Sequence, residues 1–402
     1  MTRVPFLTGA LAVLLIAGAA VPAAGAVERP AVLSAVPVAA SAAAGTPTVH
    51  DVTIIMLTPE GTPPDYTRDE ALHSLAVVDA FYANETDGAV RLRVVGATDW
   101  QTMPTSVDCA DFYPLVEYGR ERAGFVEGPD RHLLVMTPRG SDCQYATGQQ
   151  ALTLDEGGLA TVATTDPTSI AHELGHTMSL RHSSSVSCAS RWDLGSASGL
   201  PASCTRDEYG NESDIMGGGS TFYPFTAVSL AHLGALRHPV VLACGAPRRL
   251  TVSTMSAPSS AQRVVTWRNP AHPSVGYHLQ FRDAVDNLLY AQLYPSPRAR
   301  QDDAPTGVEV TRTDPLEREG GSVLTRPGDT SNGSRRIRAG ERVPLDDGMS
   351  VQVVSFDGTA HTATVDVAVP CARPASGTPG AAPAAARAAA PAPVVAQDRV
   401  RA

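Results

Sequence analysis

Three histidines and one glutamate lie close together near the middle of the sequence: His172, Glu173, His176 and His182. Residues four positions apart share one face of a helix, so His172 and His176 can direct ring nitrogens at one metal ion. Glu173 is then beside the ion without binding it. Zinc lowers the pKa of bound water toward neutrality, and a neighbouring carboxylate can take the proton as this water attacks a carbonyl group. The spacing predicts one catalytic zinc ion with Glu173 as the general base.

His182 is the predicted third zinc ligand, since a catalytic zinc ion needs three protein ligands and one open position. It follows His176 too late to share its face in a continuous helix, so we expect the helix to end and the chain to turn back. Asp166 before Pro167 supplies a cap residue and a proline for the first helical position. This start signal weighs against the alternative, a core helix carrying a hydrogen-bonded histidine pair.

The extended motif resembles that of the metzincin metallopeptidases, HExxHxxGxxH followed by a methionine turn. Residues 208–217, which end in Asp214-Ile215-Met216-Gly217, are similar to the methionine turn of the gametolysin (autolysin) family. The resemblance implies that the three histidines bind zinc, that Glu173 is the general base, and that Met216 packs beneath the metal and supports the ligand geometry.

Ser179 departs from the family pattern, which has glycine at this position. Glycine reaches left-handed backbone angles freely, whereas serine there costs roughly 1 kcal/mol or adopts a different turn. The position of His182 therefore depends on how the chain turns at Ser179.

Two other side chains compete for roles near the metal. Glu212 is an alternative third ligand, because residues 211–214 faintly resemble the downstream helix of thermolysin-like enzymes; the glycines on either side argue against a helix there. Position 218 is glycine, so the tyrosine that binds zinc in some metzincins is absent. Tyr223 could line the substrate pocket or belong to the core.

Alternating strands and helices are predicted to position the motif. Apolar or alternating runs at 52–57, 89–95, 132–136 and 158–164 indicate strands, and 69–82 indicates an amphipathic helix. This predicts an α/β (α+β) metzincin-like catalytic domain. Beyond Cys244, short β-type runs separated by turn residues predict an all-β, sandwich-like domain, with strands at 263–267, 277–281, 307–311, 349–355 and 362–369.

The chain of 402 residues is thus predicted to have five parts. They are a signal peptide at 1–26, a linker or short propeptide at 27–47, the catalytic domain at 48–245, the β-sandwich-like domain at 246–371, and a disordered Ala/Pro-rich tail at 372–402.

The first 26 residues have the features of a secretory signal peptide. Arg3 gives a positive end, residues 6–20 are an apolar run, and residues 24–26 form a small-residue cleavage site. We expect cleavage after Ala26 and secretion. The apolar run is too short and too poorly flanked to favour a membrane anchor.

Six cysteines in an oxidising compartment favour disulfides over metal thiolates. Sequential pairing is the interpretation we prefer, and a mixture of bridged and free thiols is the alternative. The expected bridges are Cys109–Cys143, Cys188–Cys204 and Cys244–Cys371.

The formal net charge of −10 argues against nucleic acid or an anionic membrane surface as the main partner. The basic run Arg335-Arg336-Ile337-Arg338 could be a local exception, although such a run is more often a solvated strand edge. We expect a monomer that acts on protein or peptide substrates. A calcium requirement is open, since nothing in the sequence supports one.

The first functional hypothesis is a secreted zinc endopeptidase that hydrolyses extracellular proteins. In metzincins an edge strand ahead of the zinc helix pairs with the extended substrate, and residues 158–163 are the expected neighbourhood, with an inner strand as the alternative. A second hypothesis is a secreted binding or adhesion protein with a structural or vestigial zinc site, against which the intact Glu173 argues. A third is a zinc amidase acting on cell-wall peptides.

Overall fold

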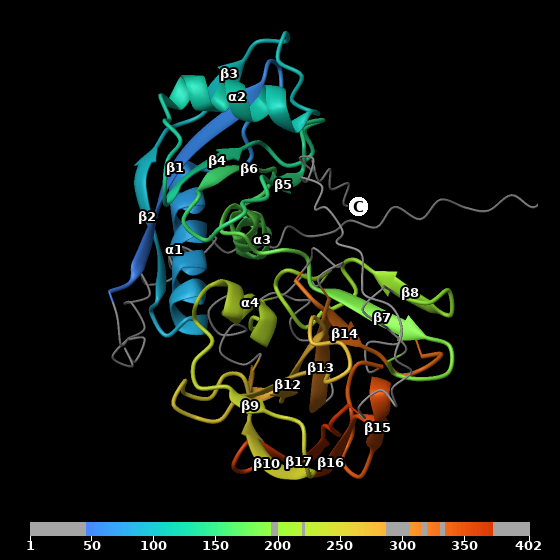
Figure 1. Ribbon diagram of the computed structural model, residues 1–402. Helices are drawn as coiled ribbons and strands as arrows, with labels where there is room; N and C mark the ends of the chain where they lie inside the picture. The colour runs from blue at the N-terminus through green and yellow to red at the C-terminus, as the bar shows by residue number, and fades with distance from the viewer. Residues whose placement is uncertain are drawn as a thin grey trace, which may run out of the picture. The chain divides into compact units, whose positions relative to one another are not determined.

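The computed structural model has a mixed α/β fold with several sheets and few helices (Figure 1). The predicted signal peptide, nearly all of the linker and nearly all of the tail lie outside the described residues. In the part that is described, no helix has both the length and the apolar character needed to cross a membrane. The described residues are 46–193, 200–218, 222–286, 306–314, 320–329 and 334–372.

The first sheet has the order β2-β1-β4-β6-β5, with β3 paired to the end of β1. All its pairings are parallel except that of β5, which runs antiparallel to β6. The four strands predicted in this part of the sequence are all present. The strands are β1 (Thr48–Pro59), β2 (Val90–Ala97), β3 (Gln101–Met103), β4 (Arg131–Met136), β5 (Ala146–Gly148) and β6 (Gly158–Val162).

Both faces of this sheet are buried, which explains the continuous apolar run in β1. Ile54 and Met56 pack with helices α1 (Arg68–Glu85) and α3 (Pro167–Thr177), whereas Ile55 and Leu57 pack on the opposite face with α2 (Phe112–Ala123). Helix α2 was not predicted. Its buried residues are Leu115, Val116 and Gly119.

A second sheet of seven strands has the order β8-β7-β14-β13-β12-β11-β9. It contains strands from both sides of the predicted domain boundary at 245/246, and that boundary stays a prediction. The strands are β7 (Ser184–Cys188), β8 (Cys204–Asp207), β9 (Val240–Leu242), β11 (Val264–Arg268), β12 (Gly276–Arg282), β13 (Gly307–Thr313) and β14 (Ser322–Leu324).

A third sheet of four strands has the order β10-β17-β16-β15. Trp267 and Tyr277 of the second sheet and Val351 and Val365 of the third belong to one hydrophobic cluster, so the two sheets share a core. The strands are β10 (Arg248–Ser253), β15 (Arg342–Pro344), β16 (Ser350–Asp357) and β17 (Thr362–Ala368); helix α4 (Ala227–His232) and the short 3₁₀ helix η1 (Asp346–Gly348) complete the elements.

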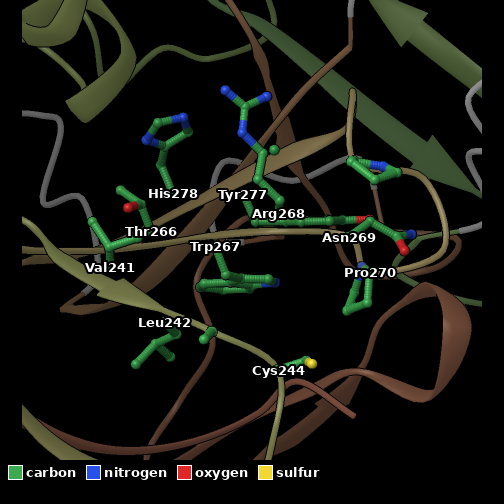
Figure 2. A pocket seen from close by; sticks show the side chains of 13 residues that line it. Val241, Leu242, Cys244, Thr266, Trp267, Arg268, Asn269, Pro270, Tyr277 and His278 are labelled. Atoms are coloured by element: carbon green, nitrogen blue, oxygen red, sulfur yellow. The ribbon is translucent and has the colours of Figure 1, made fainter. Parts of the chain in front are cut away.

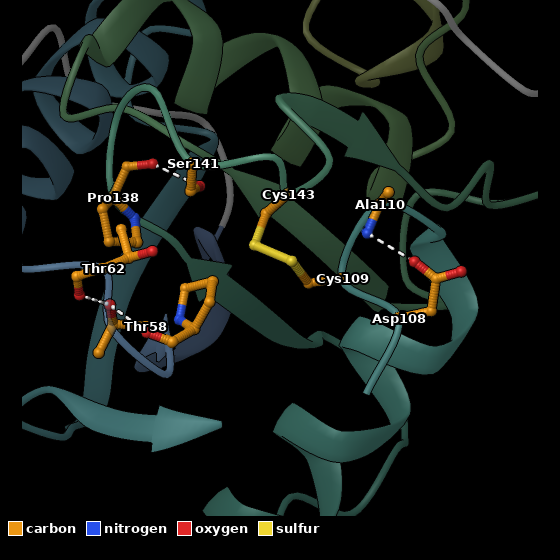
Figure 3. Close-up of a disulfide and its surroundings, with 9 residues drawn as sticks. Thr58, Thr62, Asp108, Cys109, Ala110, Pro138, Ser141 and Cys143 are labelled. Atoms are coloured by element: carbon orange, nitrogen blue, oxygen red, sulfur yellow. Dashed lines mark hydrogen bonds between the residues drawn. A yellow bond between two sulfur atoms is a disulfide. The ribbon is translucent and has the colours of Figure 1, made fainter. Parts of the chain in front are cut away.

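All six cysteines are described, and they form three disulfides in the sequential pairing that the sequence favoured. Figure 3 shows Cys109–Cys143, which joins the segment before α2 to the loop after β4. Cys188–Cys204 joins β7 to β8, and Cys244–Cys371 joins the segments that flank the third sheet. Such bridges are typical of proteins that fold in an oxidising compartment.

Candidate metal centre

Helix α3 carries His172, Glu173 and His176 and begins where the sequence predicted. Asp166 is its N-cap, with the carboxylate Oδ1 accepting a hydrogen bond from Thr168 N at 2.9 Å, and Pro167 occupies the first turn. Ile170 and Leu174 are fully buried in the core between α3 and the first sheet. This packing fixes the rotation of α3, and with it the direction in which both histidines project.

The helix ends at Thr177, and the chain turns back at Ser179. Ser179 adopts a left-handed φ of 69°, the conformation that glycine supplies in the family pattern. Ser179 N donates to His176 O at 3.1 Å and Leu180 N donates to Gly175 O at 2.9 Å, the two bonds of a Schellman motif. The serine therefore keeps the turn that the motif needs.

The turn brings His182 to the two helical histidines. One ring nitrogen from each of His172, His176 and His182 lies within 4.8 Å of the others, so the three side chains could hold one metal ion. The Nε2 atoms of His176 and His182 are 3.1 Å apart. Two tetrahedral zinc ligands with ordinary bond lengths are about 3.3 Å apart, so this separation suits zinc. We refer to these three residues as the metal-site histidines.

The opposite ring nitrogen of each metal-site histidine lies against an oxygen atom. His172 Nδ1 is 2.9 Å from Ile215 O, His176 Nδ1 is 3.0 Å from Leu180 O, and His182 Nδ1 is 2.8 Å from Glu208 Oε1. A carbonyl oxygen can only accept, so the proton resides on Nδ1 of the first two rings, and the Glu208 carboxylate has the same effect on the third. Nε2 is then the metal-binding nitrogen in all three rings. This arrangement of donors fits a zinc ion.

Strand β5 lies directly against α3. A Cβ atom added to Gly148 would lie 2.9 Å from His176 Cβ and would overlap the backbone carbonyl of Glu173, so only glycine permits this approach. β5 is one of the two edge strands of the first sheet, β2 being the other, and β6 is an inner strand between β4 and β5. The sequence expectation that residues 158–163 form the substrate-binding edge was therefore wrong, and the inner-strand alternative is correct.

Residues 208–217, here called the methionine loop, lie beneath the metal-site histidines. Met216 is fully buried, and a Cβ atom added to Gly175 in α3 would lie 2.7 Å from Met216 Sδ. The carboxylate of Asp214 accepts hydrogen bonds from Met216 N and Thr226 N, both at 2.7 Å. Burial raises the pKa of Asp214 against these hydrogen bonds. Asp214 thus holds the turn together from inside the protein.

Sequence reasoning assigned no role to Glu208 or Tyr209, although both belong to the segment that carried the family resemblance. Glu208 is the hydrogen-bond partner of His182, and the Tyr209 ring lies 4.1 Å from the His182 ring, centroid to centroid. Glu212, the competing ligand, instead forms an ion pair with Arg335 at 3.3 Å. Tyr223 is buried.

A pocket of about 450 Å³ lies elsewhere, along β9, β11 and β12 (Figure 2). Its wall includes Trp267, Tyr277, Arg268 and His278, and burial lowers the pKa of His278 to about 4. The pocket shares no residue with the metal centre, which has the stronger claim to be the functional site because it groups metal-binding nitrogens.

No family model and no curated protein matches this sequence. Among the solved structures with distant similarity, two are 13% identical to this chain. Metalloproteinase-II from Bacteroides fragilis matches with a TM-score of 0.28 over 45% of this chain and 52% of that one. A chaperone–substrate complex matches with a TM-score of 0.22 over 33% of this chain and 24% of that one. The chain therefore spans about half and about a quarter of those structures, and neither match bears on its function.

Proposed function

We propose that this protein is a secreted zinc-dependent endopeptidase with a metzincin-like catalytic region followed by a β-sandwich-like region. The observation that carries the proposal is the convergence of the three metal-site histidines, each with Nδ1 held by an oxygen acceptor. A purely structural zinc site takes four protein ligands, whereas three leave a coordination position for water or substrate.

The roles follow from the contacts of each side chain. The three histidines would hold the zinc ion, which when bound would supply Lewis-acid polarisation of a carbonyl group and a water molecule of lowered pKa. Glu173 directly follows the ligand His172 in the chain and is buried, with 5% of its surface exposed. It would accept the proton from the attacking water and pass it to the departing amine.

Strand β5 is the proposed partner of the substrate. It is an edge strand in contact with α3, so an extended peptide could add to the sheet beside the metal centre. Two exposed apolar side chains flank it, Tyr145 with 51% and Leu152 with 78% of its surface exposed. These features support protein or peptide as the substrate class. Three disulfides support secretion.

The test is the Glu173→Gln variant of the full chain, assayed for zinc content and for cleavage of casein with and without chelator. We expect about one zinc ion per wild-type chain, and proteolysis that the chelator abolishes. Glu173→Gln should keep its zinc and lose activity by about 10³-fold, within the usual range for a general base. Glu117→Gln, on the exposed surface of α2, is the matched control and should behave as wild type.

The outcomes separate the competing hypotheses. Wild-type protein that binds zinc but cleaves neither casein nor other proteins would favour a binding or adhesion protein. Cleavage of cell-wall peptides alone would favour a zinc amidase. Retained proteolysis in Glu173→Gln would rule out the proposed mechanism.

A further inference from the structure

A buried carboxylate surrounded by arginines lies in the C-terminal, β-rich part of the chain. Glu309 of β13 is fully buried, and Arg336 Nη1 lies 2.9 Å from its Oε1. Arg282 Nε of β12 lies 3.3 Å from Oε2, and Arg335 Nε lies 4.0 Å from Oε1. Arg335 and Arg336 are only 6% and 2% exposed, so the interpretation of this basic run as a solvated strand edge was wrong for both. We call these four residues the Glu309 cluster.

The Glu309 cluster stays charged although it is buried. Burial by itself would raise the pKa of Glu309, but Arg336, Arg282 and Arg335 hold it below its ordinary value. Burial lowers the pKa of Arg336 to about 10, still well above neutral pH. Buried ion clusters contribute little net stability, because desolvation offsets the attraction between the charges. In some proteins such clusters fix one geometry, and the groups that the Glu309 cluster contacts indicate which geometry it would fix here.

The cluster contacts the methionine loop at three points. Arg335 Nη1 donates to Gly210 O at 3.1 Å, and Arg335 Nη2 donates to Glu212 Oε2 at 3.3 Å. Arg336 Nη2 donates to Ser213 Oγ at 3.0 Å. Arg335 and Arg336 thus each contact Glu309 with one nitrogen of the guanidinium group and the methionine loop with another.

The same cluster also holds the segment that follows the methionine loop. Arg282 Nη2 donates to Pro224 O at 3.1 Å. Gln280, which donates to Glu309 Oε2 at 2.8 Å, accepts a hydrogen bond from Ala227 N at 2.8 Å. The loop is therefore fastened to β12 and β13 on both sides of Met216.

The methionine loop in turn contacts the backbone around the metal-site histidines. Ile215 O is the acceptor for His172 Nδ1. Ser183, the neighbour of His182, donates its N–H to Met216 O at 2.8 Å and accepts from Asn211 N at 3.1 Å. A shift of the loop would thus change the orientation of His172 and the path of the chain at His182.

We propose that Arg335 and Arg336, anchored on Glu309, are positioning residues of the metal centre. They hold the methionine loop so that Ile215 O and Met216 O orient the ligands, which makes the β-rich part of the chain a component of the site rather than an appended module. The expected effect of Arg335 and Arg336 on zinc affinity rests on the proposed function, whereas their effect on the conformation of the methionine loop does not.

The test compares Arg336→Met with Arg312→Met in the full-length protein. Arg312 of β13 is a matched control because it too is buried and ion-paired, with Asp314 at 3.0 Å and Asp193 at 3.8 Å, and both partners lie outside the methionine loop. Zinc affinity is measured by chelator competition and the ligand field by the visible spectrum of the Co²⁺-substituted protein. Amide hydrogen exchange of residues 208–217 is measured on the metal-free protein.

We expect Arg336→Met to bind zinc about 10- to 100-fold more weakly, to alter the Co²⁺ spectrum and to lose exchange protection in residues 208–217. Arg312→Met should show wild-type values for all three, measured where both variants remain folded. Equal loop protection in the two variants would overturn the proposal. Wild-type protein without zinc would overturn the proposed function alone, since the exchange comparison needs no metal.

Ser213→Ala keeps the test decisive if Arg336→Met does not fold. It removes only the hydroxyl that Arg336 contacts and leaves the ion cluster intact. We then expect a smaller loss of zinc affinity, several-fold, and reduced protection of the loop amides. Wild-type values for both would count against the proposal.

Discussion

Two groups of histidines adjoin helix α3, and they differ in how their ring nitrogens are used. In the metal centre, three rings converge and each Nδ1 lies against an oxygen. Behind the C-terminal end of α3, His50 Nδ1 lies 2.9 Å from His132 Nε2, and His132 Nδ1 lies 2.8 Å from Thr177 Oγ1. Thr177 directly follows His176, so both groups end on the same helical turn.

The difference distinguishes a group of histidines that could hold a metal ion from one that could not. His50 and His132 bond to each other and on to a hydroxyl group, which leaves no convergent set of lone pairs. The metal-site histidines bond outward to acceptors, and their remaining nitrogens meet at one point. Both groups contain imidazole rings that lie close together, and the two groups differ in where the acceptor oxygens lie.

Replacing one histidine from each group should give the largest contrast. We expect His176→Gln to reduce zinc content from about one ion per chain to near zero, because two remaining ligands do not make a stable site. His132→Gln should keep its zinc, since His132 is no part of the converging set. Elemental analysis of the purified, folded proteins measures both. Loss of zinc in His132→Gln at unchanged folding would mean that the two groups act as one.

The second group, His50 and His132, should make the stability of the fold depend on pH in the acid range. Burial lowers the pKa of His50 to about 4, against the attraction of Asp155 and Asp51, and burial together with His50 lowers the pKa of His132 to about 3. In the unfolded chain both pKa values are about 6.5, so the unfolded state binds more protons below that pH. Stability contributed by the neutral pair is therefore complete above pH 6.5 and falls as the pH drops toward 4, by up to about 1.4 kcal/mol per pH unit for each histidine.

Urea unfolding at pH 7.5 and pH 5 measures this effect, with chelator present so that metal release does not contribute. We expect the wild type to lose about 2 to 4 kcal/mol between these pH values through the pair. The double variant His50→Gln/His132→Gln lacks both titrating groups but keeps the metal-site histidines. Its free energy of unfolding should therefore fall by about 2 to 4 kcal/mol less than that of the wild type between the two pH values. An unchanged difference between the two pH values would show that the pair is not buried in neutral form.

The parts of the site that sequence reasoning found are those set by local spacing. His172 and His176 share a face because they are four residues apart, and Asp166 before Pro167 marks the start of the helix. Glu208 and Arg336 could not be found this way, because their roles depend on contacts with residues far away in the chain. Arg336 looked solvated because arginine usually is, and only the fold places Glu309 beside it.

The sheets show the same limit. Long apolar runs such as those of β1 and β4 predicted strands, and their alternation with helices predicted the mixed α/β fold. β5 is only three residues, Ala146–Gly148, with no strand pattern. The edge strand was consequently assigned to the better-patterned β6. Which strand ends at the edge is decided by pairing across the sheet, and a sequence pattern does not carry that information.

A smaller loss is expected when the acceptor of His182 is removed. Glu208→Ala deletes the carboxylate that lies 2.8 Å from His182 Nδ1 and should weaken zinc binding about 10- to 100-fold, because the ring loses its fixed tautomer and orientation. Glu208→Gln keeps an acceptor oxygen without the charge, so its zinc affinity should lie between those of Glu208→Ala and the wild type. Chelator competition ranks the three proteins. Equal zinc affinities for Glu208→Ala and wild type would show that the acceptor oxygen on Nδ1 is not what distinguishes the metal-site histidines from His50 and His132.

The smallest effect is expected at Ser179, whose turn brings His182 into the metal centre. Ser179→Gly relieves a left-handed conformation that costs serine roughly 1 kcal/mol, but it also makes the unfolded chain more flexible by a similar amount, so the net change in stability should be within about 0.5 kcal/mol. Zinc affinity should stay within about twofold. Ser179→Val, β-branched and poorly suited to this φ, should lose about 1 to 3 kcal/mol. A tenfold loss of zinc affinity in Ser179→Gly, measured by the same competition assay, would mean that the serine side chain rather than the backbone angle directs His182 to the other two ligands.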